Sequence, residues 1–269
     1  GGVVGAGGGG GGVAEEAAVF AQLGRHPNLT QMLGMSVVPS TGLDFMVLEL
    51  APLGSLDRLL AEADEAALPV RWPVLLTVAM QVCEGMCLLE ENSFVHRDLA
   101  ARNVLAFSFH PSDRSQLRVK LCDFGLTLPV ASLPPPGTSG GLGGEEEEQE
   151  ELPWRFVPPE VATLRVWSHR SDVWSFGVLM WECFSAGKVP YEAEEDDRQV
   201  ASLVTAGVTL ERPPECPTAV FAVMQRCWRR DPAARPSFEA LRLLLQDGYA
   251  AAASLSLRTT YLCECGADA

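Results

Sequence analysis

The chain has 269 residues, 47% hydrophobic and 20% charged, which predicts one large globular domain or two small lobes and excludes a largely disordered chain. Its net charge of −15 at pH 7 argues against a generic nucleic-acid binder, because phosphate backbones are bound by surfaces rich in Lys and Arg. The charge also argues against adsorption to anionic membranes, and we expect neither a membrane segment nor a secretory signal in this chain.

The excess acid is concentrated in two segments. Residues 145–151 contain six Glu, and residues 192–197 contain five acidic residues. The chain has only two lysines, Lys120 and Lys188. Its eight cysteines show no paired spacing typical of a metal site, so we expect free thiols in a reducing compartment.

The first fifty residues predict one helix and two strands. Residues 1–12 are almost entirely Gly, and we expect residues 1–14 to be flexible because they offer few side chains to bury. Residues 15–24 predict a short helix that ends at a glycine. Residues 29–38 and 44–50 predict two strands joined by a turn.

The rest of the chain is predicted to be mainly helical. Helices are expected at 54–66, 72–92 and over most of 158–249, strands at 103–107 and 117–122, and a long loop over 126–151. A few strands with one helix, followed by a mainly helical remainder, predict an α+β fold with two unequal lobes.

Two motifs carry the strongest chemical signal. Residues 94–105 read FVHRDLAARNVL, and Asp123-Phe124-Gly125 follows them. In this order they resemble the catalytic loop and the metal-binding loop of protein kinases. The resemblance implies an enzyme that uses ATP and Mg²⁺ and acts on a protein or peptide substrate. Such phosphoryl transfer needs a carboxylate to accept the hydroxyl proton and oxygen ligands to hold magnesium against the triphosphate.

The resemblance implies a role for each residue of these motifs. Asp98 is the expected catalytic base, and Arg102 is expected to help place the substrate hydroxyl. Asn103 and Asp123 are the expected magnesium ligands. LAAR between Asp98 and Asn103, together with Leu-Pro-Trp-Arg-Phe at 152–156, resembles tyrosine kinases, so tyrosine is the expected acceptor.

The large lobe carries further motifs that resemble the family. Residues 152–160 resemble the end of a kinase activation segment. Residues 171–177 resemble the buried helix beneath the catalytic loop, where Asp172 is expected to accept backbone N–H bonds. Arg235 is expected to pair with Glu160 in a buried, structural ion pair.

The small lobe resembles helix C and the strands after it. Glu16 is the expected helix-C glutamate. Phe20 and Met32 are expected to stack with His96 and Phe124 in a hydrophobic column that joins the lobes.

The hinge between the lobes is expected at residues 46–51. The Glu49 carbonyl and the Ala51 N–H are expected to meet the adenine edge, with Leu48 as the gatekeeper and Leu105 beneath the ring. The nucleotide-binding residues implied by the resemblance are therefore Glu16, Glu49, Ala51, Leu105 and Asp123.

These motifs define the predicted domain organisation. We expect a two-lobed protein-kinase-like fold with a truncated, small, β-rich N-lobe and a large, mainly helical C-lobe. Residues 15–51 are expected to form the partial N-lobe, residues 52–249 the C-lobe, and residues 250–269 a C-terminal tail.

The chain departs from the family at the phosphate site. A working kinase needs a lysine on the strand before helix C, yet no lysine precedes Lys120. The glycine run at 5–10 fits GxGxxG only as any run of glycines would. We therefore expect this chain to bind ATP poorly, and the sequence leaves open whether it is a fragment, a faulty gene model or a degenerate relative. The alternative function is a pseudokinase or interaction module that keeps the fold and regulates a partner.

The activation segment and the acidic segments also depart from the usual pattern. No Tyr lies between Asp123 and Glu160, so activation by tyrosine phosphorylation there is excluded. The six Glu of 145–151 either mimic a phosphate that pairs with Arg97 or form a solvated insertion, which is the simpler expectation. Residues 192–197 either steer basic peptides or form a solvated loop.

The cellular context is predicted only broadly. We expect a cytoplasmic location, or the intracellular portion of a larger protein. The sequence predicts no oligomeric state.

Overall fold

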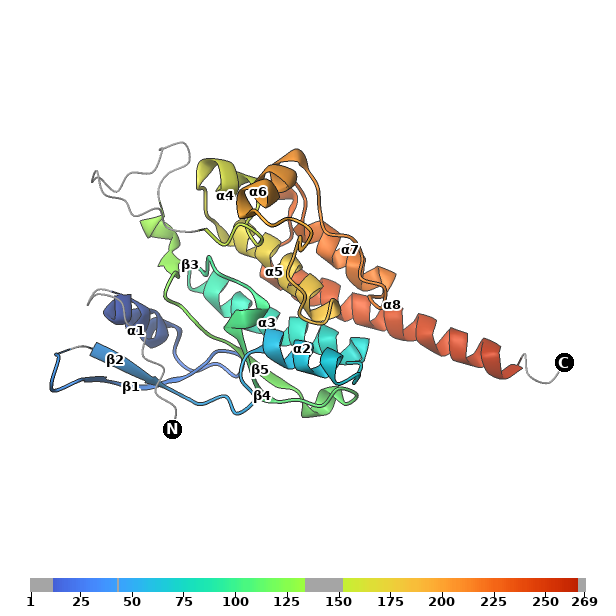
Figure 1. Ribbon diagram of the computed structural model, residues 1–269, viewed down its shortest axis with the longest axis horizontal. Helices are drawn as coiled ribbons and strands as arrows, with labels where there is room; N and C mark the ends of the chain where they lie inside the picture. The colour runs from blue at the N-terminus through green and yellow to red at the C-terminus, as the bar shows by residue number, and fades with distance from the viewer. Residues whose placement is uncertain (1–11, 43, 134–151, 266–269) are drawn as a thin grey trace.

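The computed structural model describes residues 12–42, 44–133 and 152–265, with side chains up to residue 254. Within these ranges the chain forms two unequal lobes of α and β structure, as predicted (Figure 1). Most of the predicted flexible segment lies outside the described residues.

The described part of the small lobe consists of one helix and one hairpin. Helix α1 (Gly12–Leu23) begins at residue 12 rather than 15, so residues 12–14 are helical instead of flexible. The reason is burial, because Val13 joins Ala17 and Phe20 on the buried face of the helix. Strands β1 (Met32–Val37) and β2 (Asp44–Leu48) pair antiparallel, within the predicted ranges.

The loop between α1 and β1 fixes the small lobe to the large one. The Thr30 N–H donates to the Leu121 carbonyl, and the Leu121 N–H donates to the Asn28 carbonyl, each at 2.8 Å. Gly85, on a long helix of the large lobe, must lack a side chain here, because a Cβ would lie 2.9 Å from Leu29. Helix α1 is therefore held close to the large lobe.

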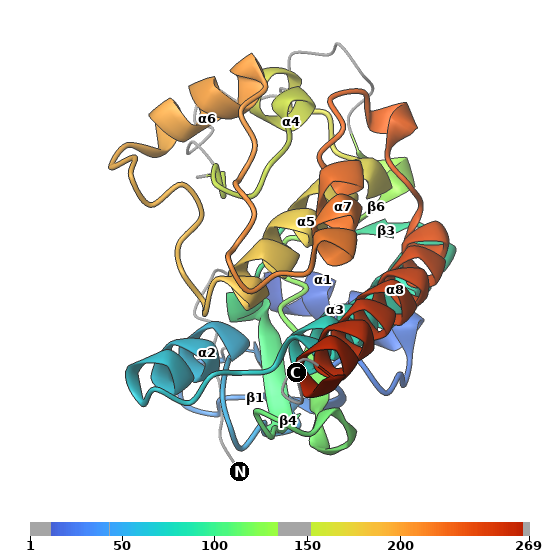
Figure 2. The ribbon, with the colours of Figure 1, turned by 90° about the vertical axis from the view of Figure 1, so that its right-hand side faces the viewer.

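The large lobe contains the remaining described elements. In chain order they are α2 (Leu56–Glu65), α3 (Trp72–Glu91), β3 (Phe94–Val95), the 3₁₀ turn η1 (Ala101–Asn103), β4 (Val104–Ser108), η2 (Arg114–Gln116), β5 (Arg118–Leu121), β6 (Leu128–Pro129), η3 (Val130–Ser132), α4 (Pro159–Leu164), α5 (His169–Phe184), α6 (Asp197–Ala206), α7 (Thr218–Cys227), η4 (Pro232–Ala234) and α8 (Phe238–Cys265). Helix α5 lies at the centre, with α3 and α7 packed against it (Figure 2). All its residues from Ser171 to Met180 are buried. The predicted mainly helical C-lobe is thus confirmed.

Helix α3 is, among the described residues, the one helix long and apolar enough to cross a membrane by length and composition. Of its apolar window, 56% is buried inside the molecule. Packing against α5 and α8 accounts for this apolar composition.

Two small sheets support the catalytic loop. Strands β4 and β5 pair antiparallel, with Leu105 opposite Lys120, near the predicted ranges. Strands β3 and β6 also pair, although β6 falls within the segment predicted as a loop. Each of these strands has two residues, too few to leave a periodic pattern in the sequence.

Helix α8 extends past the predicted lobe boundary at residue 249. It continues to Cys265 and projects from the large lobe (Figure 1). The predicted C-terminal tail is therefore helical up to residue 265. The alanines at 250–253 favour this continuation, because Ala has the highest intrinsic helix propensity.

Candidate active site

The catalytic loop runs from β3 to β4 and is held from below by α5. Asp172, in the first turn of α5, accepts the backbone N–H groups of His96 (2.8 Å) and Arg97 (3.0 Å), which confirms its predicted contacts. These bonds support Arg97 at a φ of 71°, a costly conformation for a residue with a side chain. Burial raises the pKa of Asp172 to about 7, although the two N–H bonds act in the opposite direction.

The three predicted catalytic side chains come together on this loop. The Asn103 amide donates to both the carbonyl and Oδ2 of Asp98, each at 2.7 Å. The Arg102 guanidinium forms an ion pair with Oδ1 of Asp98. Each carboxylate oxygen of Asp98 therefore has its own donor, which fixes the orientation of the carboxylate.

Arg102 also connects the catalytic loop to the segment that precedes α4. Its guanidinium lies 5.0 Å from the centre of the Phe156 ring, within the range of a cation–π contact. Phe156 belongs to the Leu-Pro-Trp-Arg-Phe motif. The structure thus joins the two sequence features that resemble tyrosine kinases.

The two predicted magnesium ligands lie on neighbouring stretches of backbone. The Cys122 N–H donates to the Asn103 carbonyl (2.9 Å), so the residue before Asp123 is bonded directly to the catalytic loop. Asp123 is exposed, has a φ of 64°, and accepts the Gly125 N–H through Oδ1 at 3.2 Å. Non-glycine residues held in such strained conformations cluster at functional sites.

The donor set at this point fits magnesium bound together with a nucleotide. Asp123 offers carboxylate oxygens, and Asn103 keeps its amide oxygen because its nitrogen is committed to Asp98. Among the described residues, no group of three His, Cys, Asp or Glu could hold a metal ion alone. Magnesium is commonly held by one or two carboxylates plus substrate phosphates and water, so this sparse set is sufficient.

Glu16 reaches the metal-binding loop from α1. Its Oε1 accepts the Phe124 N–H at 3.2 Å. Burial raises the pKa of Glu16, and the nearby Asp123 raises it further. No lysine precedes Glu16 in this sequence, and the described partner of its carboxylate is the Phe124 N–H.

The predicted hydrophobic column joins the lobes behind these residues. The Phe124 ring packs edge-on against Phe20, at 4.9 Å between ring centres, and against His96, at 5.6 Å. Met32 packs against the same core. The stacking of Phe20, Phe124 and His96 is thus confirmed, whereas the contact of Met32 with these rings stays a prediction.

The structure places the predicted adenine contacts around the hinge. Ala51 and Leu105 are half-buried, and Leu105 forms an isolated bridge with Ser55 just after the hinge. Among the described residues, neither the Glu49 carbonyl nor the Ala51 N–H takes part in a backbone hydrogen bond. Both groups therefore remain available to the edge of a base.

One contact at the hinge was not anticipated from the sequence. Lys120, on β5, donates to Oε1 of Glu49 at 2.5 Å, and the same oxygen accepts the Gln31 N–H at 2.8 Å. The Lys120 ammonium also lies 4.9 Å from the centre of the Phe107 ring. Sequence separation hid this pair, since its members are 71 positions apart in the chain.

The end of the activation segment is anchored as predicted. Arg235 makes two parallel bonds to Glu160, at 2.6 and 2.9 Å, and is only 2% exposed. Arg97 lies over the ring of Trp167, 4.9 Å from its centre. The glutamate run proposed as its partner, 145–151, lies outside the described residues.

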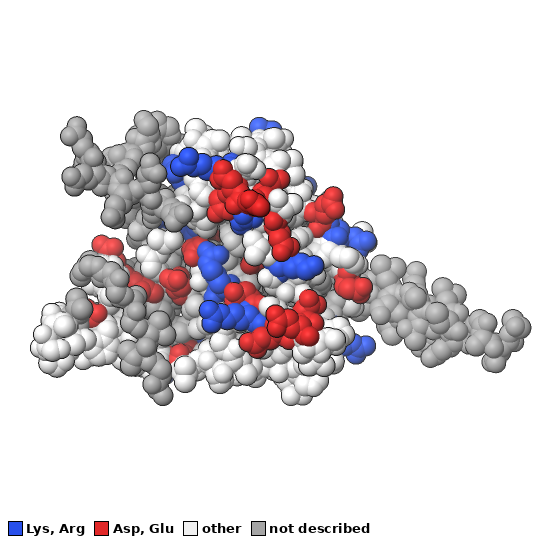
Figure 3. All heavy atoms as spheres, viewed as in Figure 1, with Lys and Arg blue, Asp and Glu red and all other residues white. Residues whose placement is uncertain are grey.

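Arg155 was missed as an organising residue. It bonds Asp197 (2.7 Å) and the carbonyls of Pro190, Tyr191 and Glu194 (2.7–2.9 Å). The acidic segment 192–197 is thus fixed to the segment before α4. Its acidic side chains contribute to the charge gathered around α6 in Figure 3.

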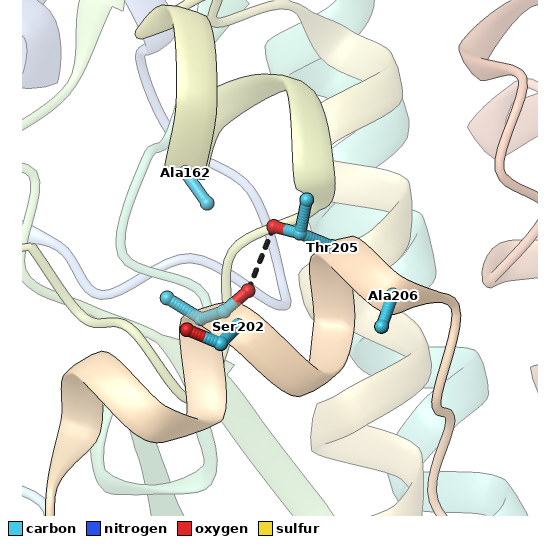
Figure 4. A pocket seen from close by; sticks show the side chains of 5 residues that line it. Ala162, Ser202, Thr205 and Ala206 are labelled. Atoms are coloured by element: carbon cyan, nitrogen blue, oxygen red, sulfur yellow. Dashed lines mark hydrogen bonds between the residues drawn. The ribbon is translucent and has the colours of Figure 1, made fainter.

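A shallow depression of about 440 Å³ lies between α4 and α6, apart from the catalytic loop (Figure 4). Its lining consists of small side chains from both helices: Ala162, Ala201, Ser202, Thr205 and Ala206. The Thr205 hydroxyl donates to the Ala201 carbonyl at 2.7 Å, so its one polar proton is used within the helix.

The two-lobed fold, the anchored catalytic loop and the adjoining metal-binding loop together define a protein-kinase catalytic domain. The protein tyrosine and serine/threonine kinase family matches residues 11–245, and the chain belongs to this family.

Three similar proteins are tyrosine kinases by name. The chain is 41% identical to human tyrosine-protein kinase Srms over 199 residues, which is 74% of this chain and 37% of the relative. It is 38% identical to human protein-tyrosine kinase 6 over 198 residues, 74% of this chain and 40% of the relative. Identity to Drosophila melanogaster tyrosine-protein kinase Btk is 38% over 227 residues, 84% of this chain and 26% of the relative. The chain thus spans two fifths or less of these relatives.

Proposed function

We propose that this chain is a catalytic domain that transfers the γ-phosphoryl group of ATP to a tyrosine hydroxyl of a protein or peptide. One observation carries this proposal: the carboxylate of Asp98 is held by both Asn103 and Arg102 beside the metal-binding loop. A carboxylate with a fixed orientation is what a base needs to accept the proton of an attacking hydroxyl.

Each residue of the site then has a defined task. Asp98 orients the substrate hydroxyl and takes its proton, and Arg102 holds Asp98 in place. Asn103 and Asp123 would hold magnesium, which when bound neutralises charge on the triphosphate. The carbonyl of Glu49, the N–H of Ala51 and the side chain of Leu105 would hold the adenine.

Tyrosine is the proposed acceptor for two reasons. The relatives are named as tyrosine kinases. In addition, Arg102, which pairs with Asp98, also contacts the ring of Phe156 in the Leu-Pro-Trp-Arg-Phe motif that resembles tyrosine kinases. We propose that the substrate is met in the cytoplasm or in the intracellular portion of a larger protein.

A magnesium-dependent ATP-binding titration tests this function, performed on the chain and on Asp123→Asn. Binding that is lost in the variant supports a nucleotide site built without the usual lysine, and phosphoryl transfer to a tyrosine peptide is then expected. Absence of binding in both would contradict the enzymatic proposal and favour a pseudokinase or interaction module. Binding that is equal in both would remove Asp123 from the site.

A further inference from the structure

Helix α5 supports the catalytic loop at a second point, remote from Asp172. Glu182 lies ten residues further along α5, about 15 Å away at the rise of an α-helix. Its Oε2 accepts the backbone N–H of Ala101 at 2.9 Å. Glu182 is 6% exposed and Ala101 is fully buried, so water cannot replace this bond.

The bond closes a gap in the hydrogen bonding of η1. Ala101 is the first residue of this 3₁₀ turn, and the first N–H of a helical turn has no partner within the turn. The turn then continues through the Asn103 N–H, which donates to the Ala100 carbonyl at 3.0 Å. Glu182 thus satisfies an N–H, that of Ala101, which the turn leaves open.

A carboxylate is an expensive residue to bury at this position. Among the described residues Glu182 forms no ion pair, and Asp57 and Asp98 add negative charge around it, offset by Arg102. A buried carboxyl group without a charged partner costs folding free energy that an apolar residue of similar size does not. Burial raises the pKa of Glu182 to about 8, which is consistent with a group retained for its hydrogen bond rather than its charge.

We propose that Glu182 is a positioning residue for phosphoryl transfer: by fixing the Ala101 N–H it sets the turn that carries Asn103, and Asn103 in turn holds Asp98. This role rests on the proposed kinase function. The catalytic loop would then be fixed by α5 at both ends, through Asp172 at His96 and through Glu182 at Ala101.

The experiment compares Glu182→Gln, which keeps an oxygen acceptor, with Glu182→Leu, which removes it. Glu90→Leu is the matched control, because the Glu90 carboxylate also accepts a backbone N–H, that of Phe238 at 2.9 Å, between α3 and α8. Two readouts are taken: amide hydrogen exchange at residues 101–103 of the free chain, and kcat and KM with ATP, Mg²⁺ and a synthetic peptide that contains one tyrosine.

Glu182→Leu is expected to speed amide exchange at Ala101 by about tenfold or more, because the N–H loses its acceptor. It is also expected to lower kcat by about 10- to 100-fold, because a small misplacement of a reacting group is costly, and to leave the KM for ATP little changed. Glu182→Gln is expected to restore both values to within about threefold, because a conservative acceptor remains. Glu90→Leu should change neither.

A second variant keeps the test decisive if Glu182→Leu does not fold. Ala101→Pro removes the N–H donor instead of the carboxylate acceptor. Proline is well tolerated at the first position of a helical turn, and the residue before it, Ala100, already has the extended backbone that proline favours. It is expected to lower kcat as Glu182→Leu does. Unchanged kcat in Ala101→Pro, or equal damage by Glu182→Gln and Glu182→Leu, would overturn the positioning role. If the parent chain transfers no phosphoryl group, the kinase function fails, while the exchange data still decide whether Glu182 anchors the loop.

Discussion

At the scale of single residues, the site depends on how a few side chains constrain one carboxylate. Asp98 has donors on both oxygens, and both donors come from the next five residues of the same loop. Local spacing therefore sets the orientation of the proposed base, which explains why a short sequence motif could predict it. The longer-range bonds from α5 then fix the loop as a whole.

The first prediction concerns Asp98 itself. Asp98→Asn is expected to lower kcat by about 10²- to 10⁴-fold, because an amide cannot accept the hydroxyl proton. ATP affinity is expected to stay within about twofold of the parent, since Asp98 is not proposed to contact the nucleotide. Phosphoryl-transfer kinetics and a nucleotide titration measure the two effects. The control is Asp113→Asn, because Asp113 is an exposed acid that bonds Ser115 and Gln116. An equal loss of kcat in both variants would argue against Asp98 as the base.

The second prediction is the effect of Glu182 on stability against pH. Its pKa rises from an ordinary 4.5 to about 8 on folding, so the folded state binds more protons than the unfolded state between these values. Stability should therefore fall as pH rises from about 4.5 to about 8, by up to about 1.4 kcal/mol per pH unit. Glu182→Gln removes this contribution. Urea unfolding at pH 5 and pH 8 measures the effect, and the parent chain is expected to lose stability relative to Glu182→Gln at the higher pH. If the difference in unfolding free energy between the two chains is the same at both pH values, the carboxyl group of Glu182 is not a buried, neutral acid.

At the scale of elements, α5 organises the large lobe because it is buried on nearly all sides. It presents Asp172 to the start of the catalytic loop and Glu182 to η1. The segment before α4 is held separately, by the Glu160–Arg235 pair. These polar groups lie in the interior, so each matters more than an equivalent surface contact.

The third prediction compares this buried pair with a surface pair. Arg235→Met is expected to destabilise the chain by about 3–5 kcal/mol, because it leaves the Glu160 carboxylate unpaired in a poorly hydrated site. Arg242→Met is the control, since Arg242 is 40% exposed and lies 3.8 Å from Glu84, and it should cost less than about 1 kcal/mol. Denaturant unfolding measures both values. Comparable losses would show that the buried pair contributes no more than a surface contact.

How much of the fold followed from sequence depends on the length of each pattern. Helix α3 was predicted to within one residue, because its apolar pattern runs over twenty residues. Strand β6 was missed because two residues carry no period. The catalytic loop could be assigned from adjacent residues, whereas the contacts of Glu182 and Lys120 could not, because each joins segments more than seventy residues apart.

At the scale of the whole molecule, several contacts between described residues hold the small lobe against the large one, and three of them lie on different elements. The first is the loop before β1, bonded to β5 through Thr30 and Leu121. The second is the aromatic contact between Phe20 and Phe124. The third is the ion pair between Glu49 at the hinge and Lys120. The described small lobe has one two-stranded hairpin, which is only marginally stable alone, so these connections carry much of its order.

The fourth prediction tests the third connection. Lys120→Met leaves the half-buried Glu49 carboxylate with only the Gln31 N–H as a donor. Amide exchange over residues 44–51 is expected to speed by roughly three- to tenfold, because the local opening free energy of the hinge falls.

The double variant Glu49→Gln/Lys120→Met provides the control for this effect. It replaces the charged pair by neutral groups, so exchange at the hinge should return toward the parent value, as expected when two residues act on one interaction. Faster exchange spread evenly over the large lobe would instead indicate general destabilisation. If exchange changes only at the hinge, the ion pair determines how firmly the Glu49 carbonyl and the Ala51 N–H are held. Lys120 would then contribute to the proposed nucleotide site through the hinge, although it is not the lysine of the phosphate site.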